Sequence, residues 1–219
     1  MFAPRRLDAE LPVFSLSIPA RLLTPQAAFD WLGAEEQDRL RVLGSARRRA
    51  QFACGRWLLH HAARQVAAGG RYRVEFSGGR PLLELPGSTA AASISHSGDL
   101  VLCALGRVAR IGVDVEEIRP RRNWAGLAAR VLHPIELGRL RGLPEAGRWQ
   151  GFYAAWTRKE ALAKALGAGL ALPFARILFS ESGELKEGRE ITGLDRGHWR
   201  ACLLDAGPQV AAALAWRVD

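Results

Sequence analysis

The chain has 219 residues, of which 48% are hydrophobic and 24% charged, so it can bury the core of one domain or of two small ones. No stretch is apolar and long enough to cross a membrane or to act as a signal peptide, and we expect a cytoplasmic protein without membrane contact. The formal net charge of +9 indicates an anionic partner, namely a nucleic acid, a phosphate-rich ligand or an acidic protein surface. A generally arginine-rich surface would explain the same charge.

The first half of the chain reads as a strand, two helices and further strands. Residues 13–18 alternate as a strand between prolines, residues 34–40 open a helix, and residues 45–68 form a long helix with Ser45 as its N-cap. Further strands are predicted at residues 72–76, 82–85, 93–97 and 100–105. Arg47, Arg48 and Arg49 lie in the first turn of the long helix, where cations oppose the helix dipole. A bound anion and a solvated basic patch explain this cluster equally well.

The three cysteines are Cys54, Cys103 and Cys202, and each lies among apolar neighbours. They are odd in number and widely separated in the chain. Such a set predicts buried free thiols in a reducing compartment rather than disulfides or a metal cluster.

The strand predicted at residues 111–116 places two carboxylates side by side. Its branched apolar residues alternate with Gly112, Asp114 and Glu116, so both acids share the face opposite the apolar one. Like charges this close repel each other unless a cation lies between them, and magnesium prefers oxygen ligands. Two solvated acids on a strand that leaves the core are the commoner meaning of so short a pattern.

A second candidate segment lies in the helix predicted at residues 150–166. Lys159 falls in the middle of its apolar stripe, with Glu160 at the edge and Lys164 one turn further on. An ammonium there needs an anion or must reach solvent along its alkyl chain, and Glu160 with Lys164 alone would be an ordinary helical ion pair. Together with the two acids of the strand, these residues indicate a cation and an anionic ligand bound at one place.

The rest of the second half reads as two helices followed, after the helix at residues 150–166, by four strands. Residues 123–132 read as a helix, Pro134 begins another, and residues 141–147 read as a loop. Strands of one antiparallel sheet are predicted at residues 177–180, 184–186, 199–204 and 210–216. Glu136, in the first turn after Pro134, either orients the site or caps its helix.

Three segments, taken in order, resemble the motifs of the 4′-phosphopantetheinyl transferases of the Sfp-like kind. They are S-I-S-H-S at residues 93–97, G-V-D-V-E at residues 112–116 and W-T-R-K-E-A-L-A-K at residues 156–164. The resemblance runs from about residue 45 to residue 172 and is weak at both ends. Three ordered motifs are more specific than any one of them alone.

The resemblance implies an α+β fold, a pseudo-dimer of two similar α+β halves with the active site at the interface between them. Residues 1–108 would be the N-terminal half with coenzyme A contacts, and residues 109–219 the C-terminal half with the metal site and the catalytic helix. Each half contains a long helix followed by strands, an order that permits this arrangement.

The activity implied by the resemblance is magnesium-dependent transfer of 4′-phosphopantetheine from coenzyme A to a serine of an apo acyl or peptidyl carrier protein. The second product is adenosine 3′,5′-bisphosphate, and the pathways served are fatty-acid, polyketide or nonribosomal peptide biosynthesis. We therefore expect a monomeric cytoplasmic enzyme that binds coenzyme A and a carrier protein, but neither nucleic acid nor membrane.

The resemblance also assigns residues to roles. The implied catalytic residues are Glu160, Asp114 and Lys164, and the implied metal ligands are Asp114, Glu116 and Glu160. Glu160 is alternatively the general base that takes the proton of the carrier serine. The implied coenzyme A contacts are Arg49, Arg80, Ser95, His96, Lys159 and Lys164. Arg80 stands where the family usually has a lysine.

Two other functions use the same residues differently. A magnesium-dependent phosphodiester or pyrophosphate hydrolase would employ the same three acids to activate water, without a protein acceptor. A basic nucleic-acid-binding protein would use the positive charge and leave the acids solvated, with affinity that falls steeply as salt is added.

Overall fold

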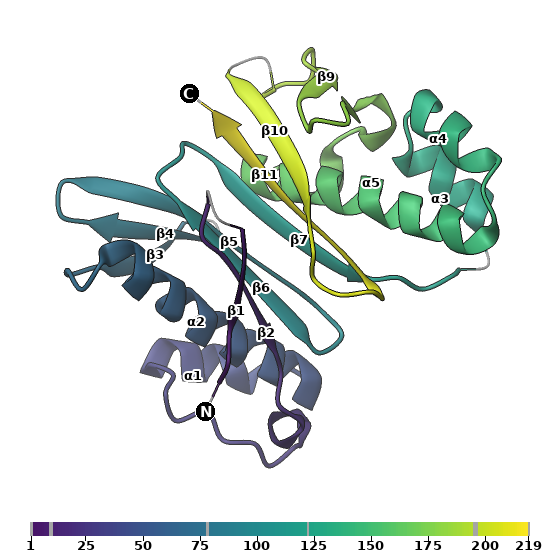
Figure 1. The fold of residues 1–219 in the computed structure, drawn as a ribbon. Coiled ribbons are helices and arrows are strands. Elements are labelled where there is room, and N and C mark those ends of the chain that lie inside the picture. Colours follow the sequence, from purple (N-terminus) through teal and green to yellow (C-terminus); the bar gives the residue numbers. More distant parts are fainter. Residues whose placement is uncertain (1, 9–10, 78, 122, 195–196, 219) are drawn as a thin grey trace. The chain divides into compact units, whose positions relative to one another are not determined.

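The computed structural model of the chain describes residues 2–8, 11–77, 79–121, 123–194 and 197–218. It divides into two compact units, Met1–Gly106 and Arg107–Asp219, and the mixed α+β class is confirmed (Figure 1). The predicted pseudo-dimer with a shared active site, and the roles of the halves 1–108 and 109–219, stay predictions. Among the described residues, no helix is long and apolar enough to cross a membrane.

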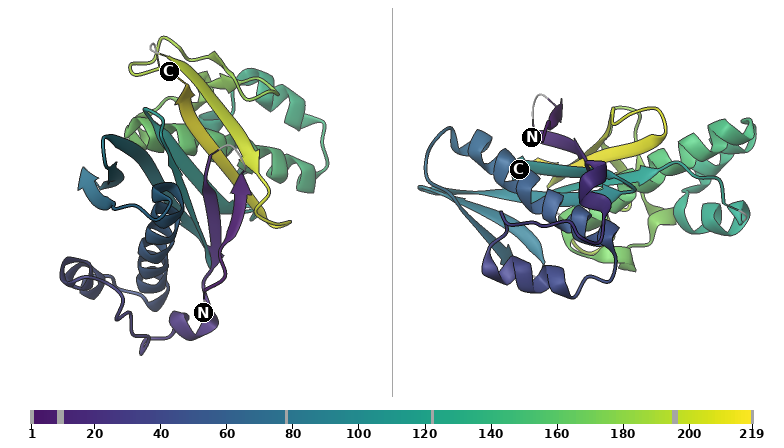
Figure 2. Two further views of the ribbon diagram at one scale, coloured as in Figure 1. Left: turned by 60° about the vertical axis from the view of Figure 1, so that its left-hand side comes forward. Right: turned by 90° about the horizontal axis from the view of Figure 1, so that it is seen from below.

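The part of unit 1 that the structure describes is a six-stranded antiparallel sheet packed against a long helix. The strand order is β1 (Arg5–Asp8), β2 (Val13–Ser17), β6 (Leu100–Gly106), β5 (Ser88–Ser97), β4 (Arg80–Leu85) and β3 (Arg73–Ser77). The short turn η1 (Ala20–Leu23) and helix α1 (Ala34–Arg41) precede helix α2 (Ala46–Ala67), which packs against β2, β5 and β6. Figure 2 shows α2 lying along one face of this sheet.

The strong local signals of unit 1 are confirmed. Helix α2 begins at its predicted cap, where the Ser45 hydroxyl accepts a hydrogen bond from the backbone N–H of Arg48 at 3.2 Å. Ala68 ends the helix in the left-handed conformation, with φ of 48°. Strand β1 was not predicted, because its sequence Arg-Arg-Leu-Asp contains no apolar alternation. Cys54 and Cys103 are buried free thiols as predicted, and burial raises their pKa values to about 11 and about 12. Cys202 of the second unit is also a reduced thiol, but it is only half-buried, so the prediction of burial was wrong for it.

The described residues of unit 2 form two antiparallel sheets and three α-helices. The larger sheet has the order β10 (His198–Leu204), β11 (Val210–Val218) and β7 (Ile111–Glu117), and the smaller pairs β8 (Leu178–Phe179) with β9 (Leu185–Glu187). The helices are α3 (Trp124–Val131), α4 (Pro134–Arg141) and α5 (Glu145–Leu166), with short turns η2 (Gly169–Ala171) and η3 (Phe174–Arg176). Helix α5 packs against all three strands of the larger sheet.

Two predictions for unit 2 were wrong. Residues 141–147 are not wholly a loop, because α5 begins at Glu145; its first four residues, E-A-G-R, include no large apolar residue, so the apolar stripe starts only later. The four C-terminal strands do not form one sheet, since β8 and β9 pair separately and a single bridge joins Glu184 to Arg200.

A glycine lets α5 approach β7 closely. A Cβ atom on Gly112 would lie 1.9 Å from the carbonyl oxygen of Ala161 and 2.6 Å from the backbone nitrogen of Ala165. No side chain fits that space. The contact fixes the helix against the strand just before Asp114.

Replacing Gly112 with alanine is expected to destabilise the fold by about 2–3 kcal/mol, because the new methyl group overlaps backbone atoms that cannot rotate away. Urea unfolding followed by circular dichroism measures this loss. Gly44→Ala is the matched control, since a Cβ atom at Gly44 meets nothing within 4 Å. Equal stability of the two variants would contradict the close approach.

Candidate active site

The acid-bearing face of β7 is covered by α5. Gly112 contacts the helix backbone, and Asp114, two residues further on the same face, is 4% exposed. The alternation predicted for this strand is therefore confirmed, whereas the interpretation of Asp114 as a solvated acid was wrong. Glu116 is half-buried on the same face.

Two residues of α5 meet this face. The ammonium of Lys164 donates to Asp114 Oδ1 at 2.7 Å, and the Lys164 side chain keeps 33% of its surface exposed. The pKa of Glu160 is raised to about 6, chiefly by burial and then by the negative charges of Asp114 and Glu116, while the positive charge of Lys164 opposes the shift. Three carboxylates and one ammonium thus influence one another at a single place.

Asp114, Glu116 and Glu160 offer the oxygen ligands that a hard cation prefers, but their described positions do not form a preorganised metal site. Among the described residues, no group of three or more His, Cys, Asp or Glu side chains is arranged to hold a metal ion. Carboxylate oxygens are nevertheless the ligands that magnesium prefers, and magnesium often takes only one or two of them from the protein. A cation there would also relieve the repulsion that raises the pKa of Glu160. The ligand set Asp114, Glu116 and Glu160 stays a prediction.

Lys159 points into the interior of unit 2 rather than toward solvent. Its side chain is fully buried, and its ammonium donates to Glu136 Oε2 at 2.6 Å and to the carbonyl oxygen of Val131 at 2.7 Å. Burial lowers the pKa of Lys159, and the charge of Glu136 opposes that shift. The interpretation that Lys159 reaches solvent was wrong, and its role as a coenzyme A contact stays a prediction that this enclosed geometry does not favour.

Glu136 caps the N-terminus of α4, which is one of the two roles predicted for it. Its Oε2 atom accepts the backbone N–H of His133 at 2.8 Å, which closes a capping box at the start of α4. The same oxygen accepts from Lys159, so one carboxylate joins the start of α4 to the middle of α5.

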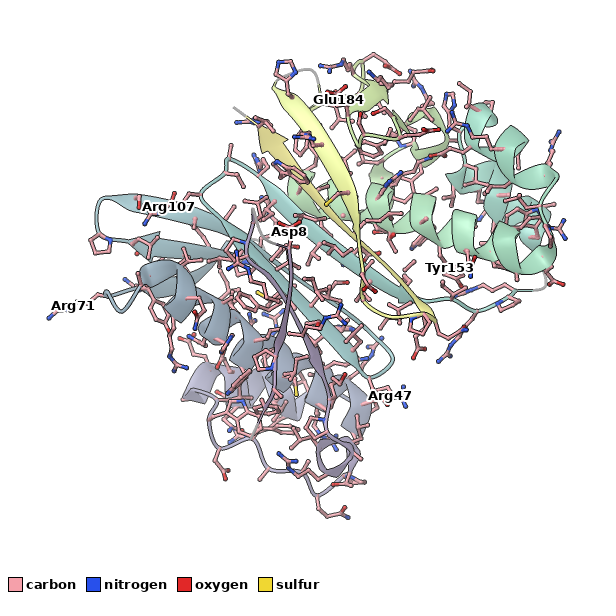
Figure 3. All side chains as sticks on the ribbon, in the orientation of Figure 1. Asp8, Arg47, Arg71, Arg107, Tyr153 and Glu184 are labelled. Atoms are coloured by element: carbon pink, nitrogen blue, oxygen red, sulfur yellow. The ribbon has the colours of Figure 1, made fainter. Side chains whose placement is uncertain are left out.

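A tyrosine on α5 fixes the segment that follows β7. The hydroxyl of Tyr153, which is labelled in Figure 3, donates to the carbonyl oxygen of Arg119 at 3.0 Å and accepts from Arg121 Nε at 3.3 Å. The carboxylate strand is therefore held against α5 beyond its last residue as well as at Gly112.

The four unit 1 residues predicted to contact coenzyme A occupy different environments. Arg49 donates to the carbonyl oxygens of Leu43 at 3.3 Å and Pro25 at 3.4 Å, so it fixes the segment before α2. Arg80 is exposed at the first residue of β4. Ser95 is buried and His96 exposed, as neighbours on opposite faces of β5. All four assignments stay predictions.

Two contacts near the predicted basic cluster could not be read from the sequence. The Gln51 amide donates to the carbonyl oxygen of Gly98 at 2.8 Å, and Arg47, which is labelled in Figure 3, forms an ion pair with Asp99 at 3.2 Å. They tie the first turns of α2 to the turn that follows Ser97. A polar residue in a helix gives no sign of so distant a partner.

Known proteins match the part of the chain that contains this site. The sequence model described as the 4′-phosphopantetheinyl transferase superfamily matches residues 110–215. The chain carries a domain of the 4′-phosphopantetheinyl transferase superfamily. This superfamily domain includes β7 and α5, and hence Asp114, Glu116, Glu160 and Lys164. The Sfp-like subtype stays a prediction.

Individual relatives agree with the superfamily match. The chain is 35% identical over 132 residues to the 4′-phosphopantetheinyl transferase HetI of Nostoc sp., with 56% of this chain and 54% of the relative covered. It is 34% identical over 123 residues to the 4′-phosphopantetheinyl transferase AcpT of Salmonella typhi, with 55% and 60% covered. A 4′-phosphopantetheinyl transferase of Bacillus subtilis is 34% identical over 107 residues, with 48% and 45% covered. The matches thus span about half of the relatives' own lengths.

Proposed function

We propose that this protein is a 4′-phosphopantetheinyl transferase that moves the phosphopantetheine group of coenzyme A to a serine of an apo carrier protein. The superfamily domain and the names of the relatives support this activity. The observation that carries it is the meeting of Asp114, Glu160 and Lys164 inside that domain. We further propose that the enzyme is monomeric and cytoplasmic and that its net charge of +9 attracts an acidic carrier.

In this reaction the serine oxygen forms a bond to the phosphorus that bears pantetheine, and the pyrophosphate P–O bond breaks. The leaving group is adenosine 3′,5′-bisphosphate, and the serine proton passes to a base. Glu160 suits that base, because its pKa of about 6 leaves it mostly ionised and yet basic enough to accept a proton near neutral pH. Lys164, partly exposed beside Asp114, can donate to a pyrophosphate oxygen.

Magnesium bound by Asp114, Glu116 and Glu160 would supply positive charge that stabilises the leaving phosphate. If Glu160 holds the metal instead of taking the serine proton, another group must act as the base. For coenzyme A itself we propose contacts from Arg49, Arg80, Ser95, His96 and Lys164.

Mass spectrometry tests the proposal directly. The protein is mixed with an apo carrier protein, coenzyme A and magnesium, and the reaction is repeated with EDTA. We expect the carrier to gain about 340 Da, the mass of one phosphopantetheine, and to lose that gain when EDTA removes the metal. A known transferase added to the same carrier shows that the carrier can accept the group. Consumption of coenzyme A without any gain on such carriers would instead identify a hydrolase.

Replacing Lys164 with alanine is expected to weaken coenzyme A binding by about tenfold or more, since it removes one charge-assisted hydrogen bond to phosphate. Isothermal titration calorimetry measures the affinity. Lys186→Ala is the control, because Lys186 is an exposed lysine of the same unit that pairs with Glu184. Unchanged affinity in Lys164→Ala would leave Lys164 only as the partner of Asp114.

A further inference from the structure

A small cavity in unit 2 lies between α4, α5 and the β8–β9 hairpin. Its volume is about 130 Å³. Residues that line it include Arg139 and Leu140 from α4, Ala154, Ala155 and Arg158 from α5, and Phe179 from β8. The cavity thus combines two guanidinium groups with apolar walls. None of the six residues belongs to the site proposed for transfer.

The size of the cavity limits its occupant. In liquid water a volume of about 130 Å³ holds about four molecules, whereas pockets for cofactors and drug-sized ligands measure about 300 Å³ or more. Leu140 contributes to this limit, because its Cδ2 atom packs where a side chain on Gly151 would begin, 2.3 Å from an ideal Cβ atom. The part of an occupant that this space holds therefore has about four to six non-hydrogen atoms.

Arg158 carries an unsatisfied polar group at this cavity. Its Nε–H is buried and has no hydrogen-bond partner among the residues that the structure describes. Burial lowers the pKa of Arg158, which reflects the loss of water around the guanidinium, while Cys202 and Glu136 oppose that shift. A buried donor without a partner costs about 1–3 kcal/mol, and more for a charged group, so a missing acceptor is expected nearby.

The acidic residues that line the cavity do not supply this acceptor. Glu136 Oε2 is engaged by Lys159 and by the backbone N–H of His133. Glu181 is exposed in the turn between β8 and β9. Because Lys159 already compensates Glu136, the two lining arginines are opposed only by the exposed Glu181, and one further negative charge would balance the group.

We propose that this cavity binds a small carboxylate anion, with the carboxylate on Arg158 and Arg139 and the carbon end against Leu140 and Phe179. The planar O–C–O group matches the guanidinium fork, which donates two parallel hydrogen bonds. Phosphate fits less well, because four oxygens would need partners where Leu140, Ala154 and Phe179 offer none.

Acetate is the probe for this proposal, used with the full chain in the absence of coenzyme A and of any carrier protein. Saturation-transfer NMR from the protein to the acetate methyl group detects binding, and titration at constant ionic strength against sodium chloride gives the affinity. Because no transfer reaction is measured, the result is independent of the proposed enzyme activity.

Three variants locate the acetate. Arg158→Gln removes the charge, Ala154→Leu fills the cavity without changing any charge, and Arg141→Gln removes an exposed charge of α4 outside the cavity. We expect Arg141→Gln to bind acetate like the unaltered protein and the other two to bind at least about tenfold more weakly. If Arg158→Gln does not fold, as judged by circular dichroism, Ala154→Leu provides the comparison.

Three results would overturn the proposal. They are the absence of saturation transfer to acetate in the unaltered protein, equal affinity in all folded variants, and tighter binding of inorganic phosphate than of acetate.

Discussion

Replacing Asp114 with asparagine is expected to lower the rate of phosphopantetheine transfer by about a hundred- to a thousandfold while the protein stays folded. Asparagine keeps the shape of the buried side chain but lacks its negative charge. Asparagine cannot form an ion pair with the Lys164 ammonium, which lies 2.7 Å from Asp114 Oδ1. It also cannot bind a cation as a carboxylate does. Initial rates of carrier modification, followed by mass spectrometry, measure the effect.

Glu117→Gln is the matched control for that experiment. Glu117 is the last residue of β7 and forms an ion pair with Arg119, outside the face that carries Asp114. We expect it to retain the unaltered transfer rate, and circular dichroism melting curves verify that both variants fold. A normal rate in Asp114→Asn would show that Asp114 serves only as the ion-pair partner of Lys164.

Local sequence patterns were sufficient to predict most elements near the site. The two faces of β7 follow from the two-residue period of any strand. Ser45 marks the start of α2 because its side chain accepts a hydrogen bond from a backbone N–H that has no partner within the helix. The start of α5 lacked such a signal, since Pro144 offers no side-chain cap and no large apolar residue follows it until Trp149. Weak ends of helices are where local patterns are least informative.

Contacts between distant segments could not be predicted from these patterns. The sequence suggests a helical pair between Glu160 and Lys164, yet the structure pairs Lys164 with Asp114, which lies on another element. The partner of Lys159 is likewise remote, because Glu136 comes from α4. In both cases the packing of an element against α5 decides which acid reaches the lysine, and spacing within one helix does not encode that packing.

The buried pair formed by Lys159 and Glu136 should make a large contribution to the stability of unit 2. Removing one partner of a buried ion pair leaves an uncompensated charge and costs about 3–5 kcal/mol. Glu136→Gln is the sharpest variant, because glutamine can still accept the N–H of His133 in a capping box but brings no negative charge to Lys159. We therefore expect Glu136→Gln and Lys159→Met each to lose about 3–5 kcal/mol in urea unfolding.

The double variant separates the ion pair from other effects. Lys159→Met combined with Glu136→Gln leaves neither charge buried alone, so it should lose clearly less than the sum of the single losses. Lys186→Met is the control, because the exposed pair of Lys186 and Glu184 should contribute less than about 1 kcal/mol. Additive losses would show that the two buried groups stabilise the fold independently.

The single variant Lys159→Met also decides whether Lys159 contacts coenzyme A. The Lys159 ammonium is enclosed by Glu136 and the Val131 carbonyl, so folded Lys159→Met should bind coenzyme A about as tightly as the unaltered protein. Its transfer rate can still fall, because Lys159 precedes Glu160 on α5 and helps to set the orientation of that helix. Weaker coenzyme A binding in a folded Lys159→Met variant would instead mean that α4 releases the lysine when the substrate binds.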